Sequence, residues 1–280
     1  MNMRSSPVPG GYCPADINGD GVVDVNDLLY LIDAWGDAGG PADINNDGIV
    51  GVNDLLELID NWGPCGLPDN IHILKASDGM SNDFFGRSVA VSGNNAVVGA
   101  WGVDDYSGAA YAFNFDGRFW QEESKITVST PKESQYLAQT VAIHGDVALI
   151  SAQFDSELAQ WSGAAYIFRR DTSQPHPQWI QEAKLMPVSE EQTYNRRFGT
   201  MIAIGEGVAF VAGKDYYGQI SPFGYIYNYD GNNWIEGQRL EPFGGASWST
   251  DGSASMSGNL LAVGNGFHNG SVWIYRFNGK

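Results

Sequence analysis

The chain is poor in cysteine, histidine and basic residues, and it has no long apolar run. Its 15 Lys and Arg stand against 33 Asp and Glu, which gives a formal net charge of −18. An acidic surface repels phosphate groups, so nucleic acid is excluded as a partner. No stretch approaches the roughly 20 apolar residues that a membrane span requires, so no such span is expected.

Motifs of common enzyme classes are missing as well. The four histidines are dispersed without metal-ligand spacing. No nucleophile elbow, phosphate-binding glycine loop or zinc pattern occurs. Glu122 and Glu182 are a conceivable carboxylate pair for glycoside cleavage. They recur at nearly matching places in repeated strands, which favours a structural role, so we expect no catalytic residues.

The two cysteines, Cys13 and Cys65, bracket one short segment. Lone thiols in cytosolic proteins are usually unpaired, whereas a pair that brackets a compact module is typical of a disulfide in an oxidising compartment. We therefore favour a disulfide and an extracellular or cell-surface location. Residues 1–12 contain no visible secretion signal and are expected to be disordered.

The segment between the cysteines holds eleven acidic residues and no Lys or Arg. The run 16–27 reads D-I-N-G-D-G-V-V-D-V-N-D and the run 43–54 reads D-I-N-N-D-G-I-V-G-V-N-D, a duplication offset by 27 residues. Oxygen-bearing side chains at positions 1, 3, 5 and 12, with glycine at position 6, are typical of a calcium loop. A solvated acidic turn without metal is the alternative.

We expect two calcium ions, one per loop, held by side-chain oxygens and one backbone carbonyl. The ligands predicted in the first loop are Asp16, Asn18, Asp20, the Val22 carbonyl, Asp24 and Asp27. Those predicted in the second loop are Asp43, Asn45, Asp47, the Ile49 carbonyl and Asp54. Position 12 is Asp in both loops, where the usual helix-loop-helix motif has Glu.

An apolar stripe with spacing i, i+3, i+4, i+7 follows each loop and predicts a short helix. The stripes consist of Leu28, Leu31, Ile32 and Trp35, and of Leu55, Leu58, Ile59 and Trp62. Gly36 and Gly63 stand where such helices end. We expect the two helices to bury these stripes against each other, in a small all-α module.

Residues 13–65 resemble a dockerin domain, on the strength of the duplicated loops and the helices that follow them. The resemblance implies that the module docks onto a cohesin-like partner. It also implies recognition residues at loop positions 10 and 11, here Val25, Asn26, Val52 and Asn53. Local packing is the alternative role for these four.

A linker at 66–70 precedes a glycine-rich and aromatic-rich region, 71–280. Strand patterns recur there four times at offsets of 52, 61 and 52 residues, and each third strand ends in aromatics. A fourth strand follows in three units, from Trp120 to Ile126, Trp179 to Leu185 and Trp234 to Leu240. Four antiparallel strands per repeat predict the blades of an all-β propeller.

The units resemble FG-GAP repeats of integrin-alpha-type propellers, with Phe85-Gly86 and Gly99-Ala100 carrying the match. They lack a D-x-D-x-D-G loop, and Asp104 and Asp105 are interpreted as solvated loop acids. The last repeat ends before its fourth strand, and Ile71 to Lys75 aligns with the missing one. We favour a four-bladed ring closed by this N-terminal strand over a fragment of a larger ring.

Six aromatic residues outside the repeat pattern lie in expected loops, where rings can stack on sugars or anchor a protein. They are Trp101, Tyr106, Trp161, Tyr216, Tyr217 and Trp248. Packing under the loops is the alternative for each.

These features together predict a non-catalytic, extracellular, calcium-binding adhesion or scaffold protein. Its dockerin-like module docks to a cohesin-like partner, while its propeller binds a protein or glycan. The alternative is a carbohydrate-binding accessory of a polysaccharide-degrading, cellulosome-like complex. Glycan pull-down separates the two.

Overall fold

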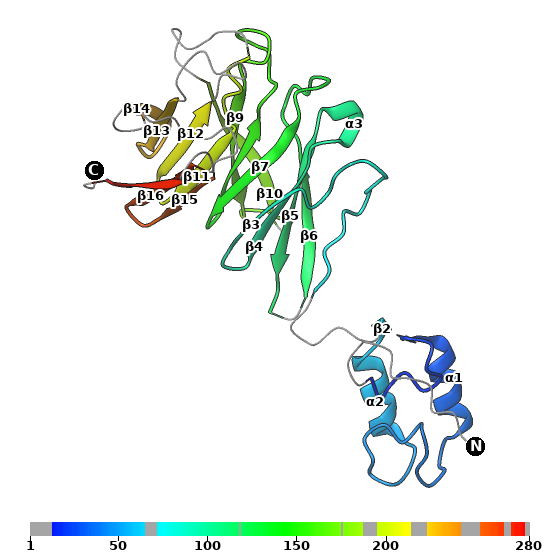
Figure 1. The fold of residues 1–280 in the computed structure, drawn as a ribbon. Coiled ribbons are helices and arrows are strands. Elements are labelled where there is room, and N and C mark those ends of the chain that lie inside the picture. Colours follow the sequence, from blue (N-terminus) through cyan, green and yellow to red (C-terminus); the bar gives the residue numbers. More distant parts are fainter. Residues whose placement is uncertain are drawn as a thin grey trace. The chain divides into compact units, whose positions relative to one another are not determined.

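The chain divides into two compact units, Met1–Ile73 and Leu74–Lys280 (Figure 1). The computed structural model describes residues 13–64, 72–117, 119–174, 176–186, 195–213, 223–241, 253–265 and 270–277. The segment expected to be disordered, 1–12, and the expected linker, 66–70, lie outside these ranges. No helix within them is long and apolar enough to cross a membrane.

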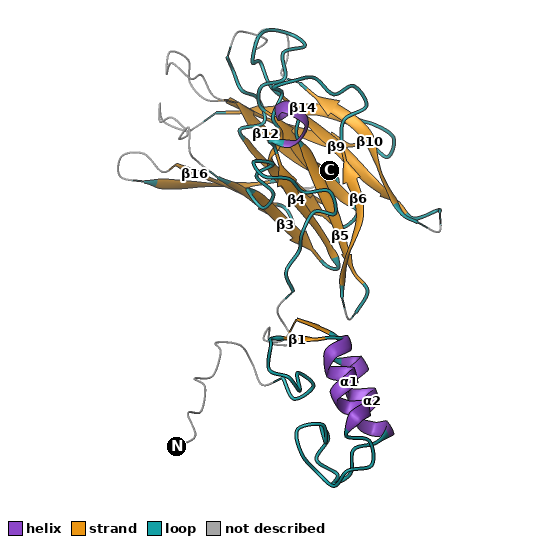
Figure 2. Ribbon diagram, turned by 90° about the vertical axis from the view of Figure 1, so that its right-hand side faces the viewer, coloured by secondary structure: helices purple, strands orange, loops and turns teal. Residues whose placement is uncertain are grey.

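The N-terminal unit consists of two helices, each directly following an acidic loop (Figure 2). The helices α1 (Val25–Asp33) and α2 (Val52–Asp60) confirm the prediction of a short helix after each loop. Strands β1 (Val22–Val23) and β2 (Gly63–Pro64) pair antiparallel, which joins the first loop to the end of the unit. The core consists of Ala15, Val23, Leu31, Ala42, Ile44, Val50 and Leu58.

The predicted burial of the helix stripes is correct only in part. Leu31 and Leu58 are fully buried, but Ile32 and Ile59 are 54% and 53% exposed, and Trp35 and Trp62 are exposed too. A nine-residue helix has about two and a half turns, so a small core covers little more than one row of its side chains. The expectation of burial is therefore wrong for Ile32, Ile59, Trp35 and Trp62, whereas Leu28 and Leu55 are partly buried against the core.

Cys13, at the start of the N-terminal unit, is disulfide-bonded. The other cysteine of the chain, Cys65, lies outside the described residues. The β1–β2 pair brings the residues just before Cys65 to the first loop. This pairing brings the end of the unit back to the part of the chain that follows Cys13.

The C-terminal unit consists of four antiparallel sheets that follow one another along the chain. The first contains β3 (Ser88–Ser92), β4 (Asn95–Ala100), β5 (Ala109–Phe115) and β6 (Trp120–Ile126). The second contains β7 (Leu137–His144), β8 (Val147–Ala152), β9 (Ala164–Asp171) and β10 (Gln178–Leu185). The third contains β11 (Met201–Gly205), β12 (Val208–Gly213), β13 (Phe223–Tyr229) and β14 (Trp234–Leu240). The fourth contains β15 (Ala254–Ser257), β16 (Leu260–Asn265) and β17 (Ser271–Arg276).

These sheets are the four blades of a propeller, as the repeats predict. Strands pair with their sequence neighbours within each blade, and the first strands β3, β7, β11 and β15 line one central cavity of about 470 Å³. In the first three blades the second strand is almost entirely buried, because blades pack on it. All six residues of β4 are buried, as are five of the six in β8 and in β12. Between the first two blades, Val97 and Ala112 pack with Ile150 and Phe168.

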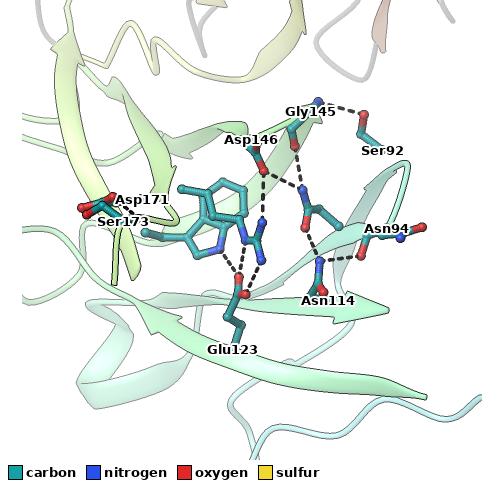
Figure 3. A network of polar contacts seen from close by, with 11 residues as sticks. Ser92, Asn94, Asn114, Glu123, Gly145, Asp146, Asp171 and Ser173 are labelled. Atoms are coloured by element: carbon teal, nitrogen blue, oxygen red, sulfur yellow. Dashed lines mark hydrogen bonds and ion pairs between the residues drawn. The ribbon is translucent and has the colours of Figure 1, made fainter. Parts of the chain in front are cut away.

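A polar network ties the first two blades together at the end where β3 turns into β4 (Figure 3). Arg170 of β9 reaches across to β6 and donates to both carboxylate oxygens of Glu123, at 2.7 and 2.6 Å. Trp179 donates to the same carboxylate at 3.2 Å. Asn95 of β4 donates to Asp146 at 3.0 Å. The hydrogen bond with Glu123 raises the pKa of Arg170, so the guanidinium stays charged.

The predicted closing strand is wrong. Residues 72–75 form no strand, and Ile71 lies outside the described residues. Leu74 and Ala76 instead pack on the outer face of the first blade, against the cluster that contains Tyr111 and Phe113. The fourth blade has three strands among the described residues. The N-terminal segment therefore covers the first blade and adds no strand to the last one.

Candidate functional site

Three carboxylates of the second acidic loop converge. Ligand atoms of Asp43, Asp47 and Asp54 all lie within 4.8 Å of one another. Asp43 is buried, and its Oδ1 has no hydrogen-bond partner among the described residues. A buried, unpartnered carboxylate oxygen beside two further carboxylates is costly without a cation. This donor set of hard oxygens fits calcium.

The loop backbone holds the same carboxylates in place. Asp54 is fully buried and accepts hydrogen bonds from the amides of Asn45 and Gly51, at 3.1 and 2.7 Å. Asp47 accepts from the amide of Ile49 at 3.1 Å and from the side chain of Asn45 at 3.0 Å. The Asn45 hydrogen bond lowers the pKa of Asp47, which favours the charged form.

The first loop has the same residue types, but the hydrogen bonds to its carboxylates differ. Asp16 accepts three backbone hydrogen bonds, from the amides of Gly19, Asp20 and Gly21. Asp27 is fully buried and accepts from the amides of Asn18 and Asp24, at 3.1 and 2.9 Å. Among the described residues, three carboxylates come within 4.8 Å of one another in the second loop and not in the first.

Asp24, at loop position 9, is the N-cap of α1. It accepts from the amide of Asn26 at 2.7 Å. The second loop has Gly51 at this place, so α2 has no side-chain N-cap. Asp54 accepts from the Gly51 amide, as Asp27 does from the Asp24 amide. Val22 and Ile49, whose backbone carbonyls are the predicted calcium ligands, are exposed residues of the two loops.

The helices carry an outer apolar row that recurs with the duplication. On α1 it consists of Val25, Leu29 and Ile32, and on α2 of Val52, Leu56 and Ile59, all more than half exposed. The spacing i, i+4, i+7 places each row on one helix face. The predicted recognition residues Asn26 and Asn53 are exposed beside these rows. The predicted stripes missed Leu29 and Leu56, although their spacing from Val25 and Val52 was visible in the sequence.

A continuous set of rings crosses the loops of the first two blades. It runs from Phe84 through Trp101, Tyr106 and Tyr136 to Phe154 and Trp161; we call these six residues the aromatic row. Phe84 and Trp101 stack at 4.2 Å with planes 5° apart. Tyr136 and Phe154 lie 4.6 Å apart, and Arg197 of the following loop lies 4.6 Å from the Phe154 ring.

The row brings together three of the six predicted ligand residues, Trp101, Tyr106 and Trp161. Tyr216, Tyr217 and Trp248 lie outside the described residues. The sequence analysis did not include Phe84, Tyr136 and Phe154 among the ligand residues. The only available signal for them was that ligand-binding loops of propellers are often rich in aromatic residues. The four-residue turn α3 (Val103–Tyr106) carries Tyr106, and its acids Asp104 and Asp105 are exposed, as their assignment to a solvated loop requires.

The carboxylates considered for catalysis are bound separately, each within its own part of the propeller. Glu122 accepts from the amide and hydroxyl of Ser77, both at 2.8 Å. Glu182 forms a two-point ion pair with Arg169, with bonds of 2.9 and 3.1 Å. Each carboxylate thus serves a contact with a side chain of its own blade or of the segment before it.

Residues 69–113 and 120–168 match the family model of the FG-GAP repeat. This match confirms the predicted FG-GAP repeats across most of the first two blades. No curated protein matches the chain.

Two solved structures resemble it at 13% identity: Sqt1 from Chaetomium thermophilum, with a TM-score of 0.39, and Trypanosoma rangeli sialidase in complex with the inhibitor DANA, with 0.40. They align with 69% and 68% of this chain, which in turn covers 43% and 36% of theirs. The chain therefore spans less than half the length of either protein.

Proposed function

We propose that this protein is an extracellular or cell-surface binding protein of two parts. The N-terminal unit is a dockerin-like module that binds two calcium ions and docks onto a cohesin-like partner. The FG-GAP propeller binds a separate ligand through the aromatic row. The observation that carries the proposal is the unpartnered Asp43 oxygen within the carboxylate cluster of the second loop.

The acidic charge of the module supports calcium. Its acids have no Lys or Arg between the cysteines to neutralise them, and its core is small. A bound cation neutralises the carboxylates and stabilises the folded state. At a calcium concentration of 100 times Kd, one site adds about 2.7 kcal/mol to the free energy of unfolding.

The outer rows support docking. Six aliphatic side chains with more than half of their surface exposed are costly in water, and their arrangement recurs on two helices. A protein partner that covers a row gains roughly 25 cal/mol per Å² of buried apolar surface. The disulfide at Cys13 supports a location in an oxidising compartment.

Calorimetric titration with calcium tests the proposal. We expect two ions per chain for the unaltered protein, and one each for Asp43→Ala and Asp16→Ala, because either change removes the position 1 ligand of one loop. Asp37→Ala, which alters an acid outside both ligand sets, is the matched control and should bind two. Fewer than two ions in the unaltered chain, or two in Asp43→Ala, would contradict the proposal.

A role as a carbohydrate-binding accessory of a polysaccharide-degrading complex is the second candidate. The aromatic row favours it, because its rings at Phe84 and Tyr106 are exposed and aromatic faces suit the flat faces of sugars.

A further inference from the structure

The first strand of the first blade exposes two valines on the face that lies opposite to the second blade. Val89 and Val91 of β3 are 66% and 64% exposed, whereas Ala90 between them packs towards the second blade. In β7 and β11 the same register places hold aliphatic residues that pack on the preceding blade; they are Val141 and Ile143 in β7, and Ile202 and Ile204 in β11. Val89 and Val91, which we call the front pair, therefore belong to a face that receives a preceding blade elsewhere in the propeller.

The last blade exposes the opposite kind of face. Trp273 and Tyr275 of β17 pack towards the third blade, whereas Val272 and Ile274 are 64% and 62% exposed. In the first three blades the register place of Ile274 holds a residue that is buried against the following blade, with 0 to 3% exposure; these residues are Ala112, Ile167 and Ile226. Val272 and Ile274, which we call the rear pair, therefore belong to a face that receives a following blade.

A hydrogen bond between the first two blades has its two partners repeated at the two ends of the propeller. Ser92, at the end of β3, accepts from the amide of Gly145 at 2.9 Å. In the last blade Ser257 holds the register place of Ser92. In the first blade Gly93, like Gly145, is the first residue of the turn after the first strand, and both have positive φ. The last blade thus carries the acceptor, and the first blade the donor, of one more such bond.

Residues 74–76 hold the place where the fourth strand of a preceding blade ends. Ile126 and Leu185, at the ends of β6 and β10, pack in the core shared with the following blade. Each of them follows a lysine, as Ala76 follows Lys75, and Ala76 packs on the first blade. The last blade has no fourth strand among the described residues. Residues 74–76 therefore mark the position of a three-stranded blade that precedes the first one.

The two ends of one chain do not supply this contact to each other. Each successive pair of blades shares a buried core, but among the described residues no core joins the first blade to the fourth. Moving the ends of one chain together would disturb three close-packed interfaces, and such interfaces resist deformation. A second copy presents both of the missing faces and leaves these interfaces unchanged.

We propose that two copies of this chain associate head to tail into one ring of eight blades. The front pair of each copy packs on the rear pair of the other, so that a two-fold axis relates two identical junctions. Eight blades lie within the usual range for a propeller. Association covers both exposed pairs, and each blade then has a neighbour on both faces. This assembly depends on neither the calcium site nor the ligand proposed above.

Analytical ultracentrifugation of the full chain at micromolar concentrations tests the proposal. We expect a dimer, with twice the mass of one chain, both in calcium and in excess chelator. Val89→Asp and Ile274→Asp should each weaken dimerisation about a hundredfold or more, because every junction then buries an unpaired carboxylate. Ile180→Asp is the matched control, since Ile180 is a half-exposed aliphatic residue of β10 in the second blade, outside both pairs. This variant should remain dimeric.

Mixing the two end variants tests the head-to-tail arrangement. A Val89→Asp chain keeps its rear pair and an Ile274→Asp chain keeps its front pair, so the mixture forms one intact junction. It should associate at concentrations where each variant alone is monomeric. Both substitutions are at exposed positions, so the circular dichroism spectrum should match that of the unaltered chain. A monomeric unaltered chain, assemblies larger than a dimer, dimerisation that both aspartates leave intact, or a mixture that stays monomeric would overturn the proposal.

Discussion

At the scale of single residues, one constellation recurs in two blades with different burial. In the first blade Asp78 accepts from Tyr111 at 2.6 Å and from Lys125 at 2.7 Å. In the second, Asp155 accepts from Tyr166 at 2.9 Å and Lys184 at 2.8 Å. The side chain of Asp155 is 2% exposed, whereas that of Asp78 is 50% exposed. The repeat thus contains its own comparison of a buried and an exposed ion pair.

Burial, the largest single influence, would raise the pKa of Asp155. The hydrogen bonds from Lys184, the Glu157 amide and Tyr166, together with the charge of Lys184, outweigh it, and the pKa lies below the usual value. Burial and the charge of Asp155 raise the pKa of Tyr166 to about 12. A lowered folded-state pKa means that the ionised carboxylate stabilises the fold above its unfolded pKa of about 3.9. This contribution is lost as the pH falls below about 4.

We therefore predict that Asp155→Asn lowers the free energy of unfolding by roughly 3 kcal/mol at pH 7, because it breaks a buried pair. Asp78→Asn should cost about 1 kcal/mol or less. Urea denaturation at pH 7 and pH 3.5 measures both. The difference between Asp155→Asn and the unaltered chain should shrink at the lower pH. Equal losses of unfolding free energy for the two variants would show that burial does not set the strength of this contact. A loss for Asp155→Asn that is the same at both pH values would show that the ionised carboxylate does not provide it.

At the scale of elements, neighbouring blades are joined by glycines at the start of their third strands. Gly108 pairs with Leu137 and Gly163 pairs with Phe198, each in a parallel bridge to the next blade. Both glycines have φ of +82°, and a Cβ at Gly163 would overlap the backbone N and O of Phe198. These two positions therefore require glycine for conformation and for space together.

Gly163→Ala should lower the free energy of unfolding by roughly 3 kcal/mol or more, because the blades must separate to admit a methyl group. Gly145→Ala is the control: Gly145 also has positive φ, +56°, but a methyl group there would meet no atom within 4 Å. Its cost should be about 1 to 2 kcal/mol from backbone strain alone. Thermal and urea denaturation compare the two. Similar losses for both would rule out a steric cause.

The elements show which parts of the fold the sequence predicts. The spacing of Trp120, Trp179 and Trp234 correctly predicts the fourth strand of three blades, because strand periodicity is local. Lys75 aligns with Lys125 and Lys184 equally well, yet residues 72–75 form no strand and Leu74 packs on the first blade. That outcome depends on the tertiary contacts of Leu74, which an alignment of repeats does not contain.

In the candidate site too, local features can be predicted from the sequence and tertiary contacts cannot. The duplicated loops indicate the carboxylates of Asp43, Asp47 and Asp54, because loop ligands lie close in sequence. The aromatic row joins Phe84 to Trp161 across two blades, through residues with left-handed backbone. Asparagine at such positions is a recognisable signal, whereas Phe84 and Tyr136 carry none. Only the folded arrangement of the loops reveals that these rings meet.

At the scale of the whole molecule, the two units differ in how their folds are stabilised. The N-terminal unit is acidic, with a small core and uncompensated carboxylates. The propeller has extensive cores between successive blades and its own polar network. Calcium should therefore control the folding of the first unit and leave the second one unchanged.

Hydrogen–deuterium exchange of the full chain, with and without calcium and read by mass spectrometry of peptides, tests this division most directly. We predict that calcium slows amide exchange in peptides from residues 13–64, including both loops and both helices. Peptides from 72–277 should exchange at unchanged rates. Unchanged exchange in 13–64, or equal slowing in the propeller, would contradict the division.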